Sequence, residues 1–151
     1  MNTGLLHIRP FQPADEAAVI GLWRMCGLVV PQNNPAADIA RKLRVAPEWF
    51  LVGEREGAVV ATCMAGYEGH RGWINYLAVH PDHRRQSLAR QIMEHAEALL
   101  RAAGCPKINL QVRRTNSAVI AFYESIGFSV DEVVSLGKRL QHDSPQDGAQ
   151  S

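Results

Sequence analysis

Residues 77–89 read L-A-V-H-P-D-H-R-R-Q-S-L-A, and this stretch decides how the chain is organised. An apolar run ends at a proline, Arg84 and Arg85 follow, and helical spacing of apolar residues begins at Leu88. We therefore predict a strand, a loop and the start of a long helix. The N–H groups at a helix start attract anions, and the two arginines add positive charge. The stretch therefore predicts a site suited to a diphosphate. The alternative is that Ser87 only caps the helix and that the arginines form a solvated surface cluster.

In the rest of the chain, the spacing of apolar residues predicts a mixed α/β sheet with helices packed on it. Two β-rich runs are joined by Glu56 and Gly57, which predicts a hairpin. The expected strands are 5–9, 49–55, 58–67, 73–80 and 108–112, with one or two more over 128–140. The expected helices are 13–26, 36–45, 88–103 and 116–126.

Length and composition bound the class of protein. The chain has 151 residues, 46% of them hydrophobic and 21% charged, which predicts one domain over 1–140 and a loose tail over 141–151. A net charge of +1 argues against a nucleic-acid binder. No apolar run reaches the ~20 residues of a membrane span, and no signal peptide is recognisable. Three scattered cysteines indicate a reducing compartment, so we expect a cytoplasmic protein.

The stretch that follows the predicted strand resembles the GNAT family of N-acetyltransferases, whose signature is V-x-P-x-x-[RQ]-x-x-G-x-[GA]. Val79, Pro81, Arg84 and Ala89 match this signature, whereas Ser87 stands where the family has glycine. A serine adds only a Cβ and a hydroxyl, so its N–H stays available unless its φ must be positive. We expect at most a modest loss of coenzyme affinity.

A second stretch, N-S-A-V-I-A-F-Y-E-S-I-G-F over 116–128, resembles a later element of the same family. The matching residues are Asn116, Ala118, Phe122, Tyr123, Gly127 and Phe128. Each of these residues can also be explained by a structural role alone, because it can cap the helix, pack in the core or end the helix. What favours the family is the presence of both elements in the right order. Further stretches, such as N-P-A-A-D-I-A-R-K-L over 34–43, are similar to the YpeA-type bacterial acetyltransferases.

The resemblance implies a twisted, mostly antiparallel sheet of six to seven strands, splayed in the middle, with four flanking helices. It also implies transfer of an acetyl group from acetyl-CoA to a primary amine by direct attack in a ternary complex, without a metal. The residues that the resemblance assigns to coenzyme binding are Leu77, Ala78, Val79, Arg84, Arg85, Gln86, Ser87, Leu88, Ala89, Asn116, Phe122 and Tyr123.

Two catalytic residues are expected. Tyr123 matches the family's tyrosine that protonates the departing thiolate; a phenol near pKa 10 stays protonated at neutral pH. Glu68 is the nearest carboxylate for deprotonating the amine, with Tyr76 or His70 positioning a water. A polar turn is an equally good interpretation of Glu68 and His70. The resemblance further implies that a backbone N–H within 77–79 holds the thioester oxygen.

The acceptor is expected to be a small-molecule or protein amine. Polar residues available to bind it are Arg24, Asn33, Asn34, Asp38 and Arg41. The main alternative function is a non-catalytic CoA-binding regulator or scaffold of the same fold. An RNA-binding function is disfavoured, because the sequence has no stacking aromatic residues interleaved with its arginines. A metal site at His80 and His83 is disfavoured as well, because no third ligand is evident. By analogy with the family, a homodimer is compatible with the chain.

Overall fold

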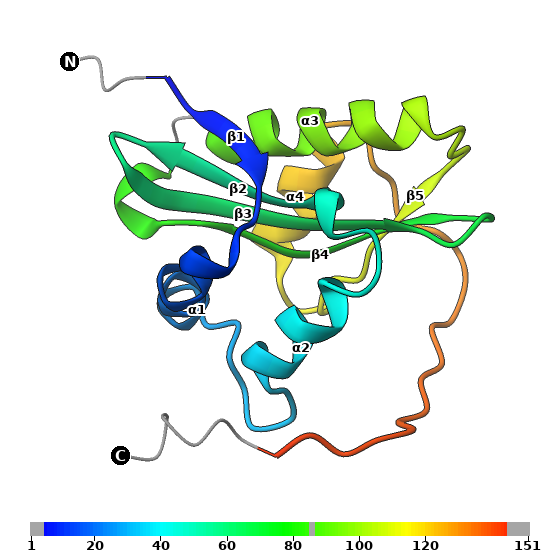
Figure 1. The fold of residues 1–151 in the computed structure, drawn as a ribbon. Helices are drawn as coiled ribbons and strands as arrows, with labels where there is room; N and C mark the ends of the chain where they lie inside the picture. The colour runs from blue at the N-terminus through cyan, green and yellow to red at the C-terminus, as the bar shows by residue number, and fades with distance from the viewer. Residues whose placement is uncertain (1–4, 85–86, 145–151) are drawn as a thin grey trace.

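The computed structural model describes residues 5–84 and 87–144, and in it one mixed sheet separates two layers of helices (Figure 1). The strand order is β1-β2-β3-β4-β5, antiparallel except that β5 runs parallel to β4. The strands are β1 (His7–Pro10), β2 (Phe50–Arg55), β3 (Ala58–Tyr67), β4 (Gly72–Val79) and β5 (Ile108–Asn109). The helices are α1 (Glu16–Met25), α2 (Pro35–Lys42), α3 (Leu88–Ala102) and α4 (Ser117–Ser125). Short 3-10 turns lie at Pro13–Asp15, Pro47–Trp49 and Pro81–His83.

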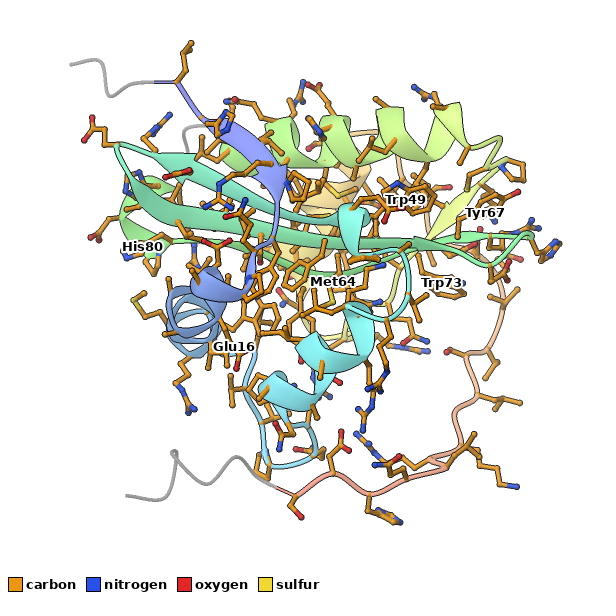
Figure 2. The ribbon with its side chains drawn as sticks, viewed as in Figure 1. Glu16, Trp49, Met64, Tyr67, Trp73 and His80 are labelled. Carbon is orange, nitrogen blue, oxygen red and sulfur yellow. The ribbon has the colours of Figure 1, made fainter. Side chains whose placement is uncertain are left out.

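The two faces of the sheet carry separate apolar cores. Phe50 and Val52 pack against α1 and α2, whereas Leu51 packs against α3 and α4. Met64, labelled in Figure 2, belongs to the core with α1 and α2. This division follows from the strand period of two, which sends successive side chains to opposite faces. A sheet covered by helices on both faces is the mixed α/β class that the sequence predicts, and that prediction is confirmed.

The β2–β3 hairpin forms where it was predicted. Glu56 and Gly57 both have positive φ, 52° and 80°. Two consecutive left-handed residues give the turn whose twist matches that of the flanking strands. The hairpin fixes the register of the central strands, Leu51 opposite Cys63, and thereby the side to which each core residue points.

The predicted number of strands is too high. Within residues 5–84 and 87–144 the sheet has five strands, not six to seven: β5 is two residues long and 128–140 forms no ladder. The reason is that β4 and β5 pair only at Gly72–Ile108 and Trp73–Asn109. Beyond that point the chain after Asn109 leaves β4, so the sheet edge offers no continuous partner.

The last described residues lie against the helical layer rather than the sheet. Arg41 of α2 holds the carboxylate of Asp143 in two hydrogen bonds of 2.6 and 2.9 Å, and that side chain is 6% exposed. Asn34 donates to the carbonyl of Ser144 at 2.9 Å. The part of the expected tail over 145–151 lies outside the described residues. Among the helices of the described ranges, none is both long and apolar enough to cross a membrane.

Candidate functional site

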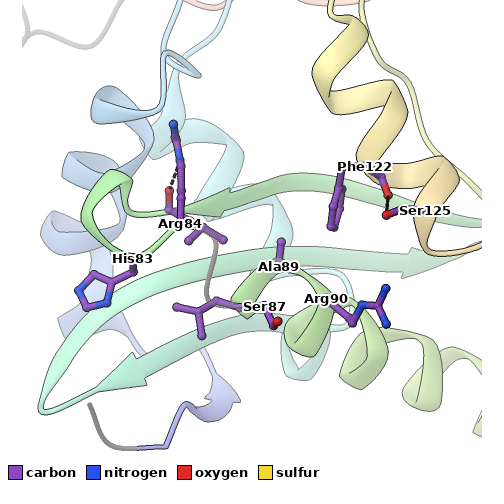
Figure 3. A pocket seen from close by; sticks show the side chains of 9 residues that line it. His83, Arg84, Ser87, Ala89, Arg90, Phe122 and Ser125 are labelled. Atoms are coloured by element: carbon purple, nitrogen blue, oxygen red, sulfur yellow. Dashed lines mark hydrogen bonds between the residues drawn. The ribbon is translucent and has the colours of Figure 1, made fainter. Parts of the chain in front are cut away.

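A pocket of about 330 Å³ opens at the start of α3. Figure 3 shows side chains from the β4–α3 loop and from α4 facing it. Residues of both family-like stretches therefore meet at one place, although ~30 positions separate them in sequence. The lining residues are Val79, His83, Arg84, Ser87, Leu88, Ala89, Arg90, Phe122 and Ser125.

Ser87 is the N-cap of α3 and has a left-handed backbone, with φ 64° and ψ 17°. Its hydroxyl makes no cap hydrogen bond to the helix, while its carbonyl accepts the first helical bond, from Gln91 N at 3.0 Å. The amides of 88–90 come before that bond and are directed out of the helix end. The position is one where glycine is favoured, which is the residue that the family signature carries there.

Arg84 adds a cation beside these amides. Its Nε donates to the carbonyl of Val79 at 3.2 Å, and its Nη2 lies 3.5 Å from Sγ of Cys26. The Cys26 thiol donates to the same carbonyl at 3.4 Å. The end of β4 thus orients an exposed guanidinium at the mouth of the pocket, where the N-terminal partial charge of α3 also acts.

Helix α4 supplies the second wall. Asn116 caps it, its Oδ1 accepting from Val119 N at 3.3 Å. Phe122 lines the pocket, whereas Tyr123 does not: it is buried in edge-to-face contact with the rings of Phe122 and Phe128, and it lines a second cavity beside β5. Burial raises the pKa of Tyr123 above its ordinary value, and nearby Cys63 raises it further. The phenol therefore keeps its proton at neutral pH.

A bulge interrupts β4 just before the pocket. Thr62 pairs with Ala78 and Met64 with Asn75, so two residues of β4 face one residue of β3. Tyr76 lies in this bulge with a φ of 52°. The extra residue reverses the alternation of side chains: Ile74 packs toward α3, but Tyr76 and Ala78 toward α1. Leu77 and Val79 are left on the side of α3 and α4.

Several contacts hold the strained Tyr76 in place. Its ring stacks on Trp23 with centroids 3.8 Å apart, and its carbonyl accepts from Thr62 Oγ1 at 2.8 Å. Its hydroxyl donates to Oδ2 of Asp38 at 2.6 Å and accepts from Asn33 Nδ2 at 2.7 Å. Burial raises the pKa of the Tyr76 hydroxyl, and the hydrogen bond to the Asp38 carboxylate raises it further. Tyr76 is thus held in a strained backbone conformation by several contacts, and strain of this kind beside a candidate site indicates a functional role.

Glu68 lies apart from the pocket. It follows β3 at the β3–β4 turn, and Figure 2 shows neighbouring Tyr67 and His80 at opposite ends of the sheet. Its Oε1 accepts from the backbone amides of Arg71, at 2.9 Å, and of His70. These two bonds lower the pKa of the Glu68 carboxyl. The geometry is that of a turn cap.

Of the twelve residues predicted to bind coenzyme, six line the pocket: Val79, Arg84, Ser87, Leu88, Ala89 and Phe122. Arg85 and Gln86 lie outside the described residues. Three further lining residues, His83, Arg90 and Ser125, were not predicted from the sequence. Helical spacing gives a signal for one of these, since Ser125 is three residues after Phe122 and shares its face. No cluster of three metal-ligating side chains occurs in the part of the chain that the structure describes.

Solved acetyltransferases share this arrangement of sheet and helices. The ribosomal-protein-S18-alanine N-acetyltransferase of Escherichia coli is 24% identical and superposes with a TM-score of 0.70 over 83% of this chain and 78% of that one. AAC(6')-Iy, solved with the bisubstrate analogue CoA-S-monomethyl-acetylneamine, is 15% identical, with a TM-score of 0.71 over 90% of this chain and 99% of that one. These likenesses show the fold.

The sequence comparison narrows the class to one family. Residues 16–128 match the family model described as Acetyltransferase (GNAT) family. An acetyltransferase of Yersinia enterocolitica is 47% identical over 135 residues, which cover 89% of this chain and 96% of that protein. The chain belongs to the GNAT acetyltransferase family, as its two sequence elements suggested.

Proposed function

We propose that this protein transfers the acetyl group of acetyl-CoA to a primary amine by direct attack in a ternary complex. The observation that carries the proposal is that the start of α3, Arg84 and Phe122 of α4 converge on one pocket. An acetyl-CoA molecule presents a diphosphate, and the free amides of 88–90 with a guanidinium beside them suit that charge. AAC(6')-Iy, which has the same fold, was solved with an analogue built on CoA, and this supports the choice of coenzyme.

The bulge in β4 offers hydrogen-bond donors for the thioester oxygen, which the reaction also requires. We propose that the coenzyme's arm follows Leu77–Val79 toward the bulge, where the interrupted ladder leaves backbone N–H groups for the thioester oxygen. The amine nitrogen then bonds to the thioester carbon, and the C–S bond breaks to release a thiolate. Tyr123, which keeps its proton and contacts the ring of the pocket residue Phe122, gives that proton to the sulfur.

We propose that Asp38, rather than Glu68, recognises the acceptor. A lysine-like amine has a pKa near 10.4 and arrives as a cation. Asp38 offers a carboxylate beside the bulge, oriented by Tyr76 and Arg41, with the Arg41 bond at 3.2 Å. Glu68 accepts two amides of its own turn on Oε1, and its lowered pKa makes it a weak base. In this scheme the ammonium group loses one proton to water before its nitrogen attacks. The second proton, lost after the C–N bond forms, returns through solvent to the Tyr123 phenolate.

The experiment is an acetyl-CoA turnover assay with a panel of amines: amino acids, polyamines, aminoglycosides and N-terminal peptides. We expect thiol release that depends on one class of amine, with the acetylated amine identified by mass. The matched comparison is Tyr123→Phe against Tyr67→Phe, because Tyr67 belongs to β3 and bonds the carbonyl of Gly69 at the far turn.

The alternative is a non-catalytic CoA-binding regulator. The observation that favours it is the strained Ser87 at a glycine position. It predicts that acetyl-CoA binds tightly while no amine of the panel accelerates thiol release above the uncatalysed rate.

A further inference from the structure

Helix α2 holds a carboxylate that comes from the end of the described chain. Arg41 donates from Nη2 to Oδ1 of Asp143 at 2.6 Å and from Nη1 to Oδ2 at 2.9 Å. Two bonds of this kind are the geometry in which a guanidinium recognises a carboxylate most selectively. The Asp143 side chain is 6% exposed, whereas that of Arg41 is 40% exposed. The carboxylate is therefore enclosed, although the arginine that holds it stays open to solvent.

This carboxylate position is adjacent to Asp38, the residue that we propose to recognise the acceptor. The same Arg41 nitrogen, Nη1, lies 3.2 Å from Oδ1 of Asp38, because the two residues are three positions apart on α2. The other Asp38 oxygen accepts from the Tyr76 hydroxyl at 2.6 Å. A place for an ammonium group and a place for a carboxylate thus adjoin each other beside the bulge of β4.

Asp143 reaches this position on a segment that the core does not anchor. Figure 1 shows the red end of the described chain running below α2. Residues 139–144 are all exposed or half-buried, and Asn34 holds the carbonyl of Ser144 at 2.9 Å. An ion pair that is partly open to solvent contributes little free energy, and a tethered group competes at an effective concentration in the millimolar range. A free carboxylate at such concentrations therefore displaces Asp143.

The charges around the position favour an anion as its occupant. The hydrogen bond from Arg41, with a smaller effect of the Arg139 charge, lowers the pKa of the Asp143 carboxyl. Two cations therefore face the position. When Asp143 leaves, the position is positive, and a carboxylate refills it better than an ammonium group does.

We propose that Arg41 binds a carboxylate of the acceptor, and that Asp143 fills this place until the acceptor displaces it. The acceptor is then an amine with a carboxylate close to its amino group, and a free α-amino acid is the simplest molecule of this class. Its ammonium group lies on Asp38 and its carboxylate on Arg41, so every charge stays paired. The inference rests on the proposed acetyl transfer and names the chemical class of the amine.

The test uses two variants that break the same ion pair from its two sides, Arg41→Gln and Asp143→Asn. Thiol release from acetyl-CoA is measured with the standard amino acids and with their carboxamides, which keep the amine and lack the carboxylate. We expect kcat/KM to be about tenfold higher, or more, for an amino acid than for its amide. Arg41→Gln should raise the KM for that amino acid about 10- to 100-fold and change the KM for the amide less than about threefold. Asp143→Asn should lower the KM for the amino acid about 3- to 10-fold, because a tethered competitor is lost.

The opposite directions of these effects distinguish binding from a merely structural ion pair. A structural pair would move both variants the same way, since each variant releases the segment from α2. Arg44→Gln and Glu132→Gln are the matched controls, because both residues are exposed, and circular dichroism checks folding. Equal kcat/KM for acid and amide would overturn the proposal even if the protein acetylates another amine. Variants whose KM values do not move in opposite directions would overturn it as well.

A binding experiment separates failure of this inference from failure of the proposed function. The NMR signals of the Asn34 side-chain amide report on the segment, because Nδ2 donates to the carbonyl of Ser144. In the presence of CoA, glycine should shift these signals toward their positions in Asp143→Asn, whereas glycinamide at the same ionic strength should not. The absence of such a shift would overturn the carboxylate site. A shift without acetylation of any amine would instead contradict the proposed acetyl transfer and the role of acceptor with it.

Discussion

The hydroxyl of Tyr76 donates a 2.6 Å hydrogen bond to Oδ2 of Asp38, which lies 38 residues earlier in the chain. This bond ties the second helix to the bulge of β4, where the central sheet begins to open. It places a carboxylate next to the strand along which we propose the acetyl group to be held. In the function that we propose, recognition of the acceptor and polarisation of the thioester therefore share one structural element.

The Asp38→Asn variant tests that relationship. We expect the KM for the acceptor amine to rise about 10- to 100-fold, because a charged partner of the ammonium group is lost, while the Kd for acetyl-CoA is unchanged. Glu68→Gln is the matched control, and steady-state kinetics on both variants is the measurement. A large loss of kcat in Glu68→Gln with normal kinetics in Asp38→Asn would return the role of acceptor carboxylate to Glu68.

Tyr123→Phe tests the proposed acid. We expect kcat to fall about 10²- to 10⁴-fold, the range of general acid catalysis, with acetyl-CoA affinity unchanged. The wild-type pH profile provides a second readout. Because burial raises the pKa of Tyr123, its acid form persists to higher pH than that of a free tyrosine. Activity should therefore rise as the amine loses its proton, with no fall due to Tyr123 below about pH 10. Equal turnover in Tyr123→Phe would remove this residue from the acid role.

Ser87→Gly should relieve the left-handed strain at the start of α3. We expect the free energy of unfolding to increase by about 1 kcal/mol and acetyl-CoA to bind at least as tightly. Ser87→Ala keeps the Cβ and removes a hydroxyl that makes no cap bond, so it should behave like the wild type. Urea unfolding and calorimetric titration measure the two effects. If Ser87→Ala weakened binding strongly, the hydroxyl itself would contact the ligand.

Gly72 of β4 lies opposite Ile108 in the short pairing of β4 with β5. A Cβ built on Gly72 would lie 2.9 Å from Sγ of Cys105 and 3.3 Å from Cδ1 of Leu100. Gly72→Ala should therefore destabilise the fold by about 1–2 kcal/mol, as crowding of a packed core does. Gly66→Ala in β3 is the control, since the nearest atom to its Cβ would be Lys42 Nζ at 4.0 Å. Thermal unfolding of both variants compares them, and equal stability would contradict the close packing at this point.

Local patterns were sufficient to predict much of the fold. Glu56 and Gly57 signalled the β2–β3 hairpin because both adopt the positive φ that such a turn needs. The apolar spacing from Leu88 predicted α3 because one face of that helix packs on the sheet. In the same way Asn116 marked the start of α4 by capping it.

Features that depend on tertiary packing were not predictable. A tyrosine at positive φ has no local signal, so the bulge at Tyr76 and its link to Asp38 could not be derived from spacing. Ser87 itself gives no signal of its left-handed backbone, which is indicated only by the glycine that the family signature carries at this position. Residues 128–140 have the alternation of a strand, yet a strand forms only where a partner edge exists, and β5 offers two residues.

The most direct test of the central claim is calorimetric titration of the full chain with acetyl-CoA, with Arg84→Ala and Arg101→Ala in parallel. Arg101 is the control, because it is exposed on α3 in the last turn of the helix, at the opposite end from the pocket. We predict one site of micromolar affinity that weakens about tenfold in Arg84→Ala and falls further with salt, but is unchanged in Arg101→Ala. No binding at millimolar acetyl-CoA would contradict the assignment of the pocket and, with it, the proposed acetyl transfer.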